Sequence, residues 1–356
     1  MSADDTTTPQ LPDTQKAWLA VKRGVPSNAL RLEQQHPVPK NLPKGEILVA
    51  VQAAALNPVD YKILKLLPAP ISWRPHVMAS DFSGIVVDPN GTALSKGQEV
   101  FGIIPVELQR KTKQGALAEY LRVPAENVVP RPENINPTQA AGVSLVTLTA
   151  YQGLFDVGKL EPGQSLFVNG GSTAVGAAAI QLAKAIGCKV TATASGKNEE
   201  YVKSLGADVF IDYTKGPVYK ALEDDPPSPK FHLILEAVGN IDLPLWLHSE
   251  KYLAPRTAVF MLPSVNQRLS SKVAKYIFET SLRPSWLGGV KRHWRLITLR
   301  LKHDQLEHIA KLISEGKLKP PIDSVYSFED VVKAYERLMT KRARGKVVVK
   351  VDPNAT

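Results

Sequence analysis

The sequence of 356 residues contains one cysteine, Cys188, and no long hydrophobic run. A single cysteine excludes a disulfide framework and a cysteine-rich structural zinc site. No apolar run approaches the roughly 18–20 residues that a membrane-spanning helix needs. The stretch 1–15 is polar and lacks arginine, so it fits neither a signal peptide nor a mitochondrial presequence. We expect residues 1–15 to be disordered and the protein to be cytoplasmic.

Acidic residues are outnumbered by basic ones, 34 against 44, which gives a formal net charge of +10. The segment 283–302, RPSWLGGVKRHWRLITLRLK, carries six of the basic residues and two tryptophans. It has no signature of a base-stacking module, so we expect no nucleic-acid partner. We predict a loop followed by an amphipathic helix that serves as a packing or oligomer surface. A membrane surface is the less favoured alternative.

Strand patterns punctuated by proline and glycine predict an irregular β-rich domain in the first part of the chain. The clearest of these strand patterns lie at 46–57, 81–88 and 115–124. From about residue 145 the pattern changes to apolar strands that alternate with helices, which predicts a parallel sheet buried on both faces. Its predicted strands are 165–170, 189–194, 208–213, 231–239 and 257–263.

The end of the chain repeats this alternation on a smaller scale. Residues 304–318 predict an amphipathic helix that ends at a glycine, and 327–351 predict a helix capped by Ser327 and then a strand. A terminal strand stays ordered only when a sheet holds it. We therefore expect the last strand to return to the first domain.

The stretch 167–187, FVNGGSTAVGAAAIQLAKAIG, predicts a strand, a tight turn and a helix, as in a dinucleotide site. Backbone N–H groups at such a helix N-terminus bind pyrophosphate oxygens. Glycines form the turn and allow close helix packing, although Thr173 and Ala174 replace glycine. The alternative is a structural crossover without a ligand. The candidate phosphate-binding residues are Gly170, Gly171, Ser172, Thr173, Ala174, Val175 and Gly176.

The next strand, KVTATASGKN, discriminates between cofactors because it lacks the acidic residue that binds the ribose 2′-hydroxyl of NAD. Ser195 and Lys197 stand there instead, and both favour a 2′-phosphate. Tyr213, at the end of the following strand, can add a hydroxyl. We therefore predict NADPH as the cofactor; the alternative for Lys197 is a surface lysine without a role. The candidate cofactor site also includes Val238, Gly239 and Lys346.

Motifs in a fixed order show that the chain resembles the medium-chain dehydrogenase/reductases. They are ALNPVDYKI (55–63), SDFSGIVV (80–87), GALAEY, LTAYQGL (148–154), the glycine turn, LGADVFIDY (205–213) and RGKVVV (344–349). Within that superfamily it is similar to the zinc-free quinone oxidoreductase (zeta-crystallin-like) branch and to fungal trans-acting enoyl reductases.

The resemblance implies an α/β fold with a GroES-like β-rich domain and a doubly wound Rossmann domain. It places the GroES-like catalytic domain at 16–144 and 299–356 and the NADPH-binding domain at 145–298. It also implies a homodimer, because edge strands of the Rossmann sheet often pair in this superfamily.

Zinc-dependent relatives carry Cys, His and Cys at positions that match Asn57, Ser80 and Leu145, so the resemblance implies no metal site. Without a Lewis acid, taking a hydride from an alcohol has no obvious driving force. Adding a hydride to a conjugated acceptor is easier than taking one from an alcohol, because the negative charge that the hydride brings delocalises into an enolate.

The resemblance places Asn57 near the nicotinamide or the substrate carbonyl and Thr149 near the nicotinamide ribose or carboxamide. Lys62 is the main catalytic candidate, since an ammonium there can stabilise an enolate or donate a proton. Tyr61 is the competing donor. The alternative for Lys62 is a surface lysine whose stem packs on apolar neighbours.

The sequence thus predicts an NADPH-dependent, zinc-independent reductase of small quinones or α,β-unsaturated carbonyls. One alternative is an enoyl reductase acting on thioesters linked to a carrier or to CoA, with the basic segment 283–302 as the docking surface. Another is an NADPH-binding sensor or membrane-surface protein with little turnover. An assay of NADPH consumption across acceptor classes separates the three.

Overall fold

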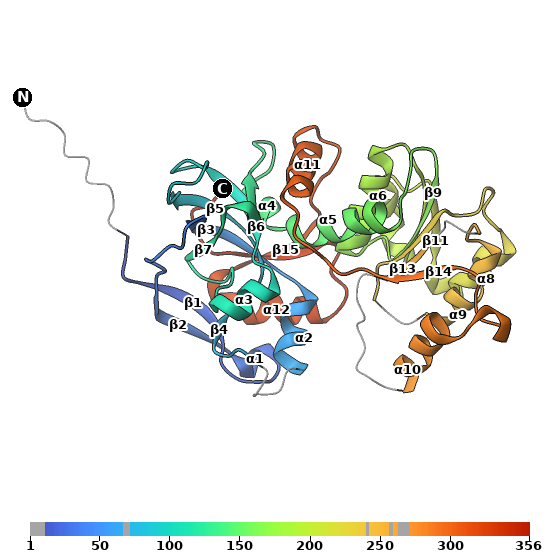
Figure 1. Ribbon diagram of the computed structural model, residues 1–356, viewed down its shortest axis with the longest axis horizontal. Coiled ribbons are helices and arrows are strands. Elements are labelled where there is room, and N and C mark those ends of the chain that lie inside the picture. Colours follow the sequence, from blue (N-terminus) through green and yellow to red (C-terminus); the bar gives the residue numbers. More distant parts are fainter. Residues whose placement is uncertain (1–10, 67–71, 240–241, 256–258, 263–270) are drawn as a thin grey trace, which may run out of the picture.

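Two large sheets lie in opposite halves of an elongated molecule (Figure 1). This computed structural model describes residues 11–66, 72–239, 242–255, 259–262 and 271–356. The first strand starts at Thr14, inside the stretch 1–15 that was expected to be disordered, because it pairs with two other strands. The part of that prediction covering residues 1–10 lies outside the described residues.

The first sheet joins both ends of the chain. Its order is β15 (Ile322–Ser327), β16 (Lys346–Lys350), β3 (Glu46–Leu56), β5 (Asp81–Asp88), β6 (Glu99–Ile103) and β8 (Val128–Pro130), with β7 (Tyr120–Pro124) also on β3. The last strand, β16, pairs antiparallel with β3, which confirms the expected return of the chain. Beside this sheet lies a smaller one of β2 (Leu30–Pro37), β1 (Thr14–Ala20) and β4 (His76–Val77).

The second sheet is parallel and has six strands. Their order is β11 (Val209–Asp212), β10 (Lys189–Ala194), β9 (Ser165–Asn169), β12 (Leu233–Glu236), β13 (Val259–Leu262) and β14 (His293–Leu296). Successive residues of β12 enter different cores: Leu233 and Leu235 join one cluster, and Ile234 joins another. This sheet is therefore buried on both faces, as a doubly wound fold requires. The predicted fold class is confirmed.

Helices cover both large sheets. They are α1 (Pro26–Ala29), α2 (Pro58–Leu66), α3 (Val106–Thr112), α4 (Pro137–Ala141), α5 (Ser144–Tyr151), α6 (Ala174–Ala185), α7 (Glu199–Ser204), α8 (Val218–Asp224), α9 (Leu243–Leu247), α10 (Ser271–Ile277), α11 (His303–Ser314) and α12 (Val331–Met339). Helices α5, α6 and α11 contribute to the core on one face of the parallel sheet, and α8 and α9 to the core on the other.

Helix α11 lies above the junction of the two halves (Figure 1). Its buried residues Leu306, Ile309 and Ile313 belong to the core of the parallel sheet, although the predicted limits place it in the GroES-like domain. The same core includes Phe101 and Val129 of the first sheet, so the two halves share apolar contacts. The domain limits themselves stay a prediction.

Two local predictions were wrong. The segment 283–302 contains no α-helix: residues Ser285–Leu287 form a short 3-10 turn, and His293–Leu296 form strand β14. As a strand, residues 293–296 satisfy backbone N–H and C=O groups by pairing in parallel with β13. The partner strand is far away in the sequence, so the local pattern did not indicate it. Ser327 makes no capping hydrogen bond to the backbone; its hydroxyl donates to Asp330 Oδ2 at 3.0 Å instead.

Candidate active site

The glycine turn joins β9 to α6 in the geometry that a phosphate-binding loop needs. Gly170 has φ +92°, a region that side chains other than glycine rarely adopt. A Cβ on Gly176 would lie 2.2 Å from the carbonyl oxygen of Gly170, so only glycine allows the helix to approach the turn this closely. Both glycines therefore have the backbone role expected of them in the turn, and their contact with a cofactor stays a prediction.

Thr173 caps α6, which explains why threonine replaces glycine in the turn. Its Oγ1 accepts a hydrogen bond from the backbone N–H of Gly176 at 3.0 Å and donates one to the carbonyl of Gly170 at 2.8 Å. Side-chain caps of this kind stabilise a helix start by about 1 kcal/mol. The side chain braces the turn, a role that the sequence pattern alone did not reveal.

The residues facing outward from this turn suit an anionic ligand. Ser172, Thr173, Ala174 and Val175 are half-buried, whereas the three glycines of the motif are packed inside. Backbone N–H groups in the first turn of a helix have no acceptor within the helix, and the helix dipole favours negative charge there. The residues present thus fit the pyrophosphate of a dinucleotide.

The end of β10 lies beside the glycine turn. Asn198 is buried, and its Nδ2 donates to Ser195 Oγ at 3.1 Å and to Ser172 Oγ at 3.4 Å, so it links the two loops. Lys197 is exposed. Tyr213 follows β11 and is 52% exposed. These three predicted residues, Ser195, Lys197 and Tyr213, are at least partly accessible to solvent and follow the carboxyl ends of β10 and β11.

Asp212 is a carboxylate that the sequence reasoning missed at this place. Its Oδ2 lies 2.5 Å from where a Cβ on Gly196 would stand, and its Oδ1 accepts hydrogen bonds from Thr214. These hydrogen bonds, the one from the Thr214 hydroxyl foremost, lower the pKa of Asp212. Asp212 is the last residue of β11 and pairs with Ala194 at the end of β10. Its position near the end of a predicted strand was the feature of the sequence that could have identified it.

A second group of predicted residues forms a buried network in the first domain. Lys346 Nζ donates to Asp81 Oδ2 at 2.8 Å and to Asn57 Oδ1, and Asn57 Nδ2 donates to Asp81 Oδ2 at 2.9 Å. The backbone N–H of Leu145 donates to Asp81 Oδ1 at 3.0 Å. Asp81 and Asn57 are fully buried and Lys346 is 2% exposed.

Asn57 and Lys346 therefore do not present their polar atoms to a ligand. Both ends of the Asn57 amide are used inside the protein, and the Lys346 ammonium neutralises Asp81. The network ties β16 to the ends of β3 and β5, as expected of a buried charge that needs a partner. The structure corrects the expectation that these two side chains contact cofactor or substrate directly.

Asp60 extends this network toward α12. Its Oδ2 accepts from the Asn57 backbone N–H at 2.8 Å and from the Tyr335 hydroxyl at 3.4 Å. Burial raises the pKa of Asp60 to about 7, and the Asn57 N–H and the Lys346 charge oppose this rise. Asp60 is thus a structural acid in the core of the first domain.

Tyr61 and Lys62, the two proton-donor candidates, have different surroundings on α2. Tyr61 packs against the core of the first domain with Lys65 Nζ 6.0 Å from its ring centre, and burial raises the pKa of its hydroxyl. Lys62 is half-buried, and burial together with the nearby Lys341 charge lowers the pKa of its ammonium. Thr149, on α5, donates its hydroxyl to the Leu145 carbonyl at 2.7 Å.

The structure brings some of the predicted cofactor residues into contact. A Cβ on Gly170 would lie 2.6 Å from Val238 Cγ2, so the turn after β9 packs directly on the loop after β12. Gly239 follows in that loop with φ +71°. The predicted site residues thus divide into an accessible group around the glycine turn and a buried brace around Asp81.

No metal cluster is present in the part of the chain that the structure describes: no three His, Cys, Asp or Glu side chains gather there. The positions that match zinc ligands in the resemblance have other partners. Asn57 and Leu145 bond to Asp81, and Ser80 Oγ accepts from Gln109 Nε2 at 3.1 Å.

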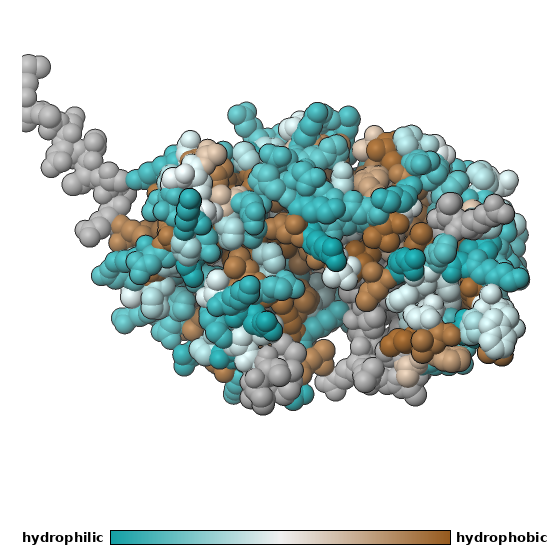
Figure 2. Space-filling model, viewed as in Figure 1, coloured by the Kyte–Doolittle hydropathy of each residue, from teal (hydrophilic) through white to brown (hydrophobic). Residues whose placement is uncertain are grey.

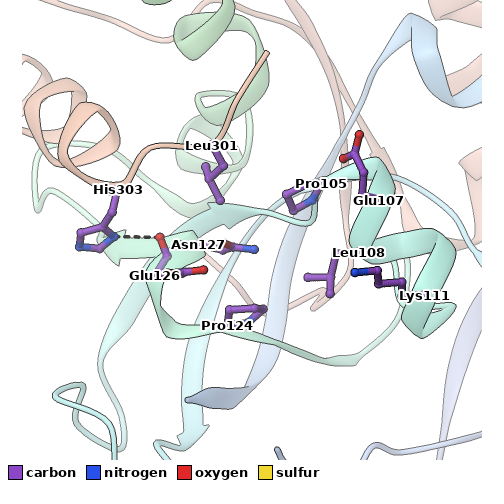
Figure 3. Close-up of a pocket in the computed structure, with 9 residues that line it drawn as sticks. All are labelled: Pro105, Glu107, Leu108, Lys111, Pro124, Glu126, Asn127, Leu301 and His303. Atoms are coloured by element: carbon purple, nitrogen blue, oxygen red, sulfur yellow. Dashed lines mark hydrogen bonds between the residues drawn. The ribbon is translucent and has the colours of Figure 1, made fainter. Parts of the chain in front are cut away.

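A cavity of about 350 Å³ lies away from both groups of predicted residues (Figure 3). Helix α3 forms one side, and residues 124–127 and 301–303 form the other. His303 bonds through Nδ1 to the carbonyl of Glu126 at 2.9 Å across its edge. The cavity contains none of the predicted site residues, so it is not the candidate cofactor site.

Two family models match the chain. One for the alcohol dehydrogenase GroES-like domain matches residues 43–133, and one for zinc-binding dehydrogenases matches residues 205–349. The chain is 35% identical over 360 residues to the trans-enoyl reductase pgmF of Aspergillus terreus, covering 96% of this chain and 98% of that protein. It is 33% identical to the 2-methylene-furan-3-one reductase of Solanum lycopersicum, covering 98% of this chain and 82% of that protein.

The solved quinone oxidoreductase of Coxiella burnetii has a similar fold, with a TM-score of 0.77 and 26% identity over 95% of this chain and 99% of that one. The fold, the glycine turn and these matches define an oxidoreductase with a GroES-like and a Rossmann domain. The chain belongs to the medium-chain dehydrogenase/reductase superfamily, and fungal trans-enoyl reductases are among its relatives. Membership implies a nicotinamide cofactor. Within the described residues, no helix is long and apolar enough to cross a bilayer.

Proposed function

We propose that this chain is an NADPH-dependent, zinc-independent reductase of quinones or α,β-unsaturated carbonyls. The observation that carries the proposal is the glycine turn at the start of α6, with Ser195 and Lys197 beside it at the end of β10. Relatives named for the reduction of enoyl, furanone and quinone substrates support the class of acceptor.

The residues that would hold the cofactor come from three loops. The outward residues 172–175 and the first turn of α6 would bind the pyrophosphate. Ser195, Lys197 and Tyr213 would bind the 2′-phosphate, and Val238 and Gly239 would line the nicotinamide half. When bound, the cofactor supplies a hydride, so the protein's own part is to orient the acceptor and to provide a proton.

The preference for NADPH is tested by KM values for NADPH and NADH. Lys197 and Ser195 favour a phosphate, whereas the Asp212 carboxylate beside Gly196 favours a ribose hydroxyl, so the comparison is decisive. We expect Lys197→Ala to raise KM for NADPH about tenfold and to leave KM for NADH unchanged. Lys189→Ala, at the opposite end of β10, is the matched control. A wild-type preference for NADH would overturn the assignment.

Lys62 is the proton donor that we propose over Tyr61. A lowered ammonium pKa makes Lys62 a better acid near neutral pH, while the raised pKa of the Tyr61 hydroxyl makes it a poorer one. We expect Lys62→Ala to lower kcat for enones at least tenfold, and Lys65→Ala on the same helix to leave it unchanged. Enone turnover that Lys62→Ala does not alter would remove Lys62 from the mechanism.

A second candidate function is enoyl reduction on thioesters linked to a carrier or to CoA. The identity of 35% to a trans-enoyl reductase over nearly the whole chain favours it. A panel of small quinones, enals, enones and enoyl thioesters separates the two, since turnover confined to thioesters supports the second. Tight NADPH binding without oxidation by any acceptor would contradict both and favour a sensor.

We also propose that the protein forms a homodimer through the outer edge of β14. This strand pairs with β13 on one side, and exposed apolar side chains precede it in the chain: Leu282 is 67% exposed, Trp286 81% and Leu287 54%. Figure 2 shows apolar side chains gathered over α10 and the turns after it, at the lower right. Sedimentation of the wild type and of Leu287→Asp tests this proposal, and a monomeric wild type would refute it.

A further inference from the structure

Three polar side chains form a row across the centre of the parallel sheet. Thr193 of β10 lies opposite Asn169 of β9, and Asn169 lies opposite Glu236 of β12. Each stands at or next to the last position of its strand, where ligands of doubly wound sheets bind. They are 0%, 7% and 1% exposed, so all three are buried among apolar strands.

Hydrogen bonds run along the whole row without a break. Thr193 Oγ1 accepts from the Gly170 N–H at 2.9 Å and donates to Asn169 Oδ1 at 2.6 Å. Asn169 Nδ2 then donates to Glu236 Oε1 at 3.3 Å. The glycine turn at one end is thereby connected to a buried carboxyl group at the other.

Glu236 holds the loop that follows its own strand. Its Oε1 accepts from the Val238 N–H at 3.1 Å and its Oε2 from the Gly239 N–H at 2.9 Å. With Asn169, three N–H donors converge on one carboxyl group. A carboxyl group offers acceptor capacity on both oxygens whether it is ionised or protonated, whereas an amide offers only one oxygen and would turn its own N–H group toward a donor.

We propose that Glu236, acting through Asn169 and Thr193, is a positioning residue that fixes the glycine turn and the Val238–Gly239 loop relative to each other. The inference rests on the proposed function, because these two loops are the ones that would hold the two halves of a nicotinamide dinucleotide. Their direct packing, with a Cβ on Gly170 only 2.6 Å from Val238 Cγ2, means that a shift of one loop moves the other.

The surroundings of Glu236 show that its burial is costly. Burial raises the pKa of Glu236 to about 8, the two backbone N–H groups oppose this rise, and the Asp242 charge adds to it. Asp242 and the buried Tyr276 both lie near Glu236, and neither is a cation that could neutralise it. Among the residues that the structure describes, Glu236 forms no ion pair, and a role in ligand binding explains why a buried acid is kept there despite its cost to stability.

The test is cofactor binding to the purified apoenzyme, measured by fluorescence titration with NADPH and NADH. Glu236→Gln and Thr193→Val should each raise the Kd of the preferred cofactor about 10- to 100-fold, the equivalent of losing hydrogen bonds to a charged or buried group. KM for that cofactor should rise in parallel, with kcat changed less. Thr191→Val is the matched control, since Thr191 is buried on the same face of β10 but lies outside the row; its Kd should stay within twofold.

Exchanging the amide of Asn169 and the carboxyl of Glu236 tests whether the hydrogen-bonded row acts as one unit. Asn169→Asp alone places two carboxyl groups together and should weaken binding, but Asn169→Asp with Glu236→Gln restores a donor facing an acceptor. The double variant should therefore bind more tightly than Asn169→Asp alone. Unfolding in urea is measured in parallel for every variant.

The outcomes are separable. Wild-type Kd in a folded Glu236→Gln protein would overturn the inference, as would an equal loss of binding in Thr191→Val. If the wild type binds neither NADPH nor NADH, the proposed function fails first, and with it the basis of this inference.

Discussion

Lys346 and Asp81 form the ion pair most deeply buried among the described residues, and its loss is the sharpest test of how the last strand is held. The two side chains are 2% and 0% exposed and 2.8 Å apart. Replacing Lys346 with methionine keeps the apolar stem and removes the charge. Asp81 would retain the Asn57 and Leu145 N–H donors but would become an unneutralised buried charge.

The expected loss of stability follows from the geometry of the Lys346–Asp81 pair. At 2.8 Å, Coulomb's law with an effective dielectric constant of about 20 gives about 6 kcal/mol of attraction. Removing the ammonium also removes its desolvation cost, which offsets part of this loss. Measurements on broken buried pairs leave a net cost of about 3–5 kcal/mol. Since domains are stable by only about 5–15 kcal/mol, loss of this pair should remove at least about a fifth of the stability of the first domain.

The assay is urea denaturation followed by tryptophan fluorescence, with Lys346→Met compared with Lys350→Met. Lys350 lies on the same strand but is partly exposed and outside the network, so its substitution should cost less than about 0.5 kcal/mol. Lys346→Met with Asp81→Asn should recover part of the loss, because it removes the unneutralised charge. A Lys346→Met protein within about 1 kcal/mol of the wild type would refute the reasoning.

Two further predictions concern Asp60, beside the buried network around Asp81, and Gly176 of the glycine turn. Because burial raises the pKa of Asp60 to about 7 from 3.8, its carboxyl stays neutral in the folded protein while it ionises in the unfolded chain. Stability should therefore fall by up to about 1.4 kcal/mol per pH unit as pH rises between these values, and Asp60→Asn should remove that part of the slope in urea titrations at pH 4 to 8. Gly176→Ala should abolish cofactor binding in a fluorescence titration, since its Cβ would lie 2.2 Å from the Gly170 carbonyl oxygen, whereas Gly216→Ala meets no atom within 4 Å and should bind normally.

The sequence was most informative where a local pattern decides the structure. Strand β5 has the predicted bounds, and β9 and α6 lie within theirs, because apolar runs and glycine punctuation act over a few residues. The return of β16 to β3 was predictable from its terminal position. The roles of Gly170 and Gly176 were predictable because only glycine meets their backbone requirements.

Strand β14 shows where local pattern fails. It has only four residues, HWRL, too few for their pattern to distinguish a helix from a strand. Tertiary contacts determine the conformation of this segment. It pairs in parallel with β13, and Trp294 Nε1 donates to the buried Tyr276 hydroxyl at 3.0 Å. Both contacts join residues far apart in the sequence, so a local pattern cannot contain them.

The same limit explains why Asn57 and Lys346 were assigned to the ligand, and why Glu236 was not assigned at all. The position of a residue in a motif says which segment it belongs to, but the register between strands says which neighbour its side chain meets. For Lys346 that neighbour is Asp81, so a cation expected at the cofactor braces the fold instead. For Glu236 it is Asn169, so an acid without a motif acquires a connection to the glycine turn. In both sheets, the chemistry available at a predicted site therefore depends on the buried side chains at the strand ends as much as on the loops that follow them.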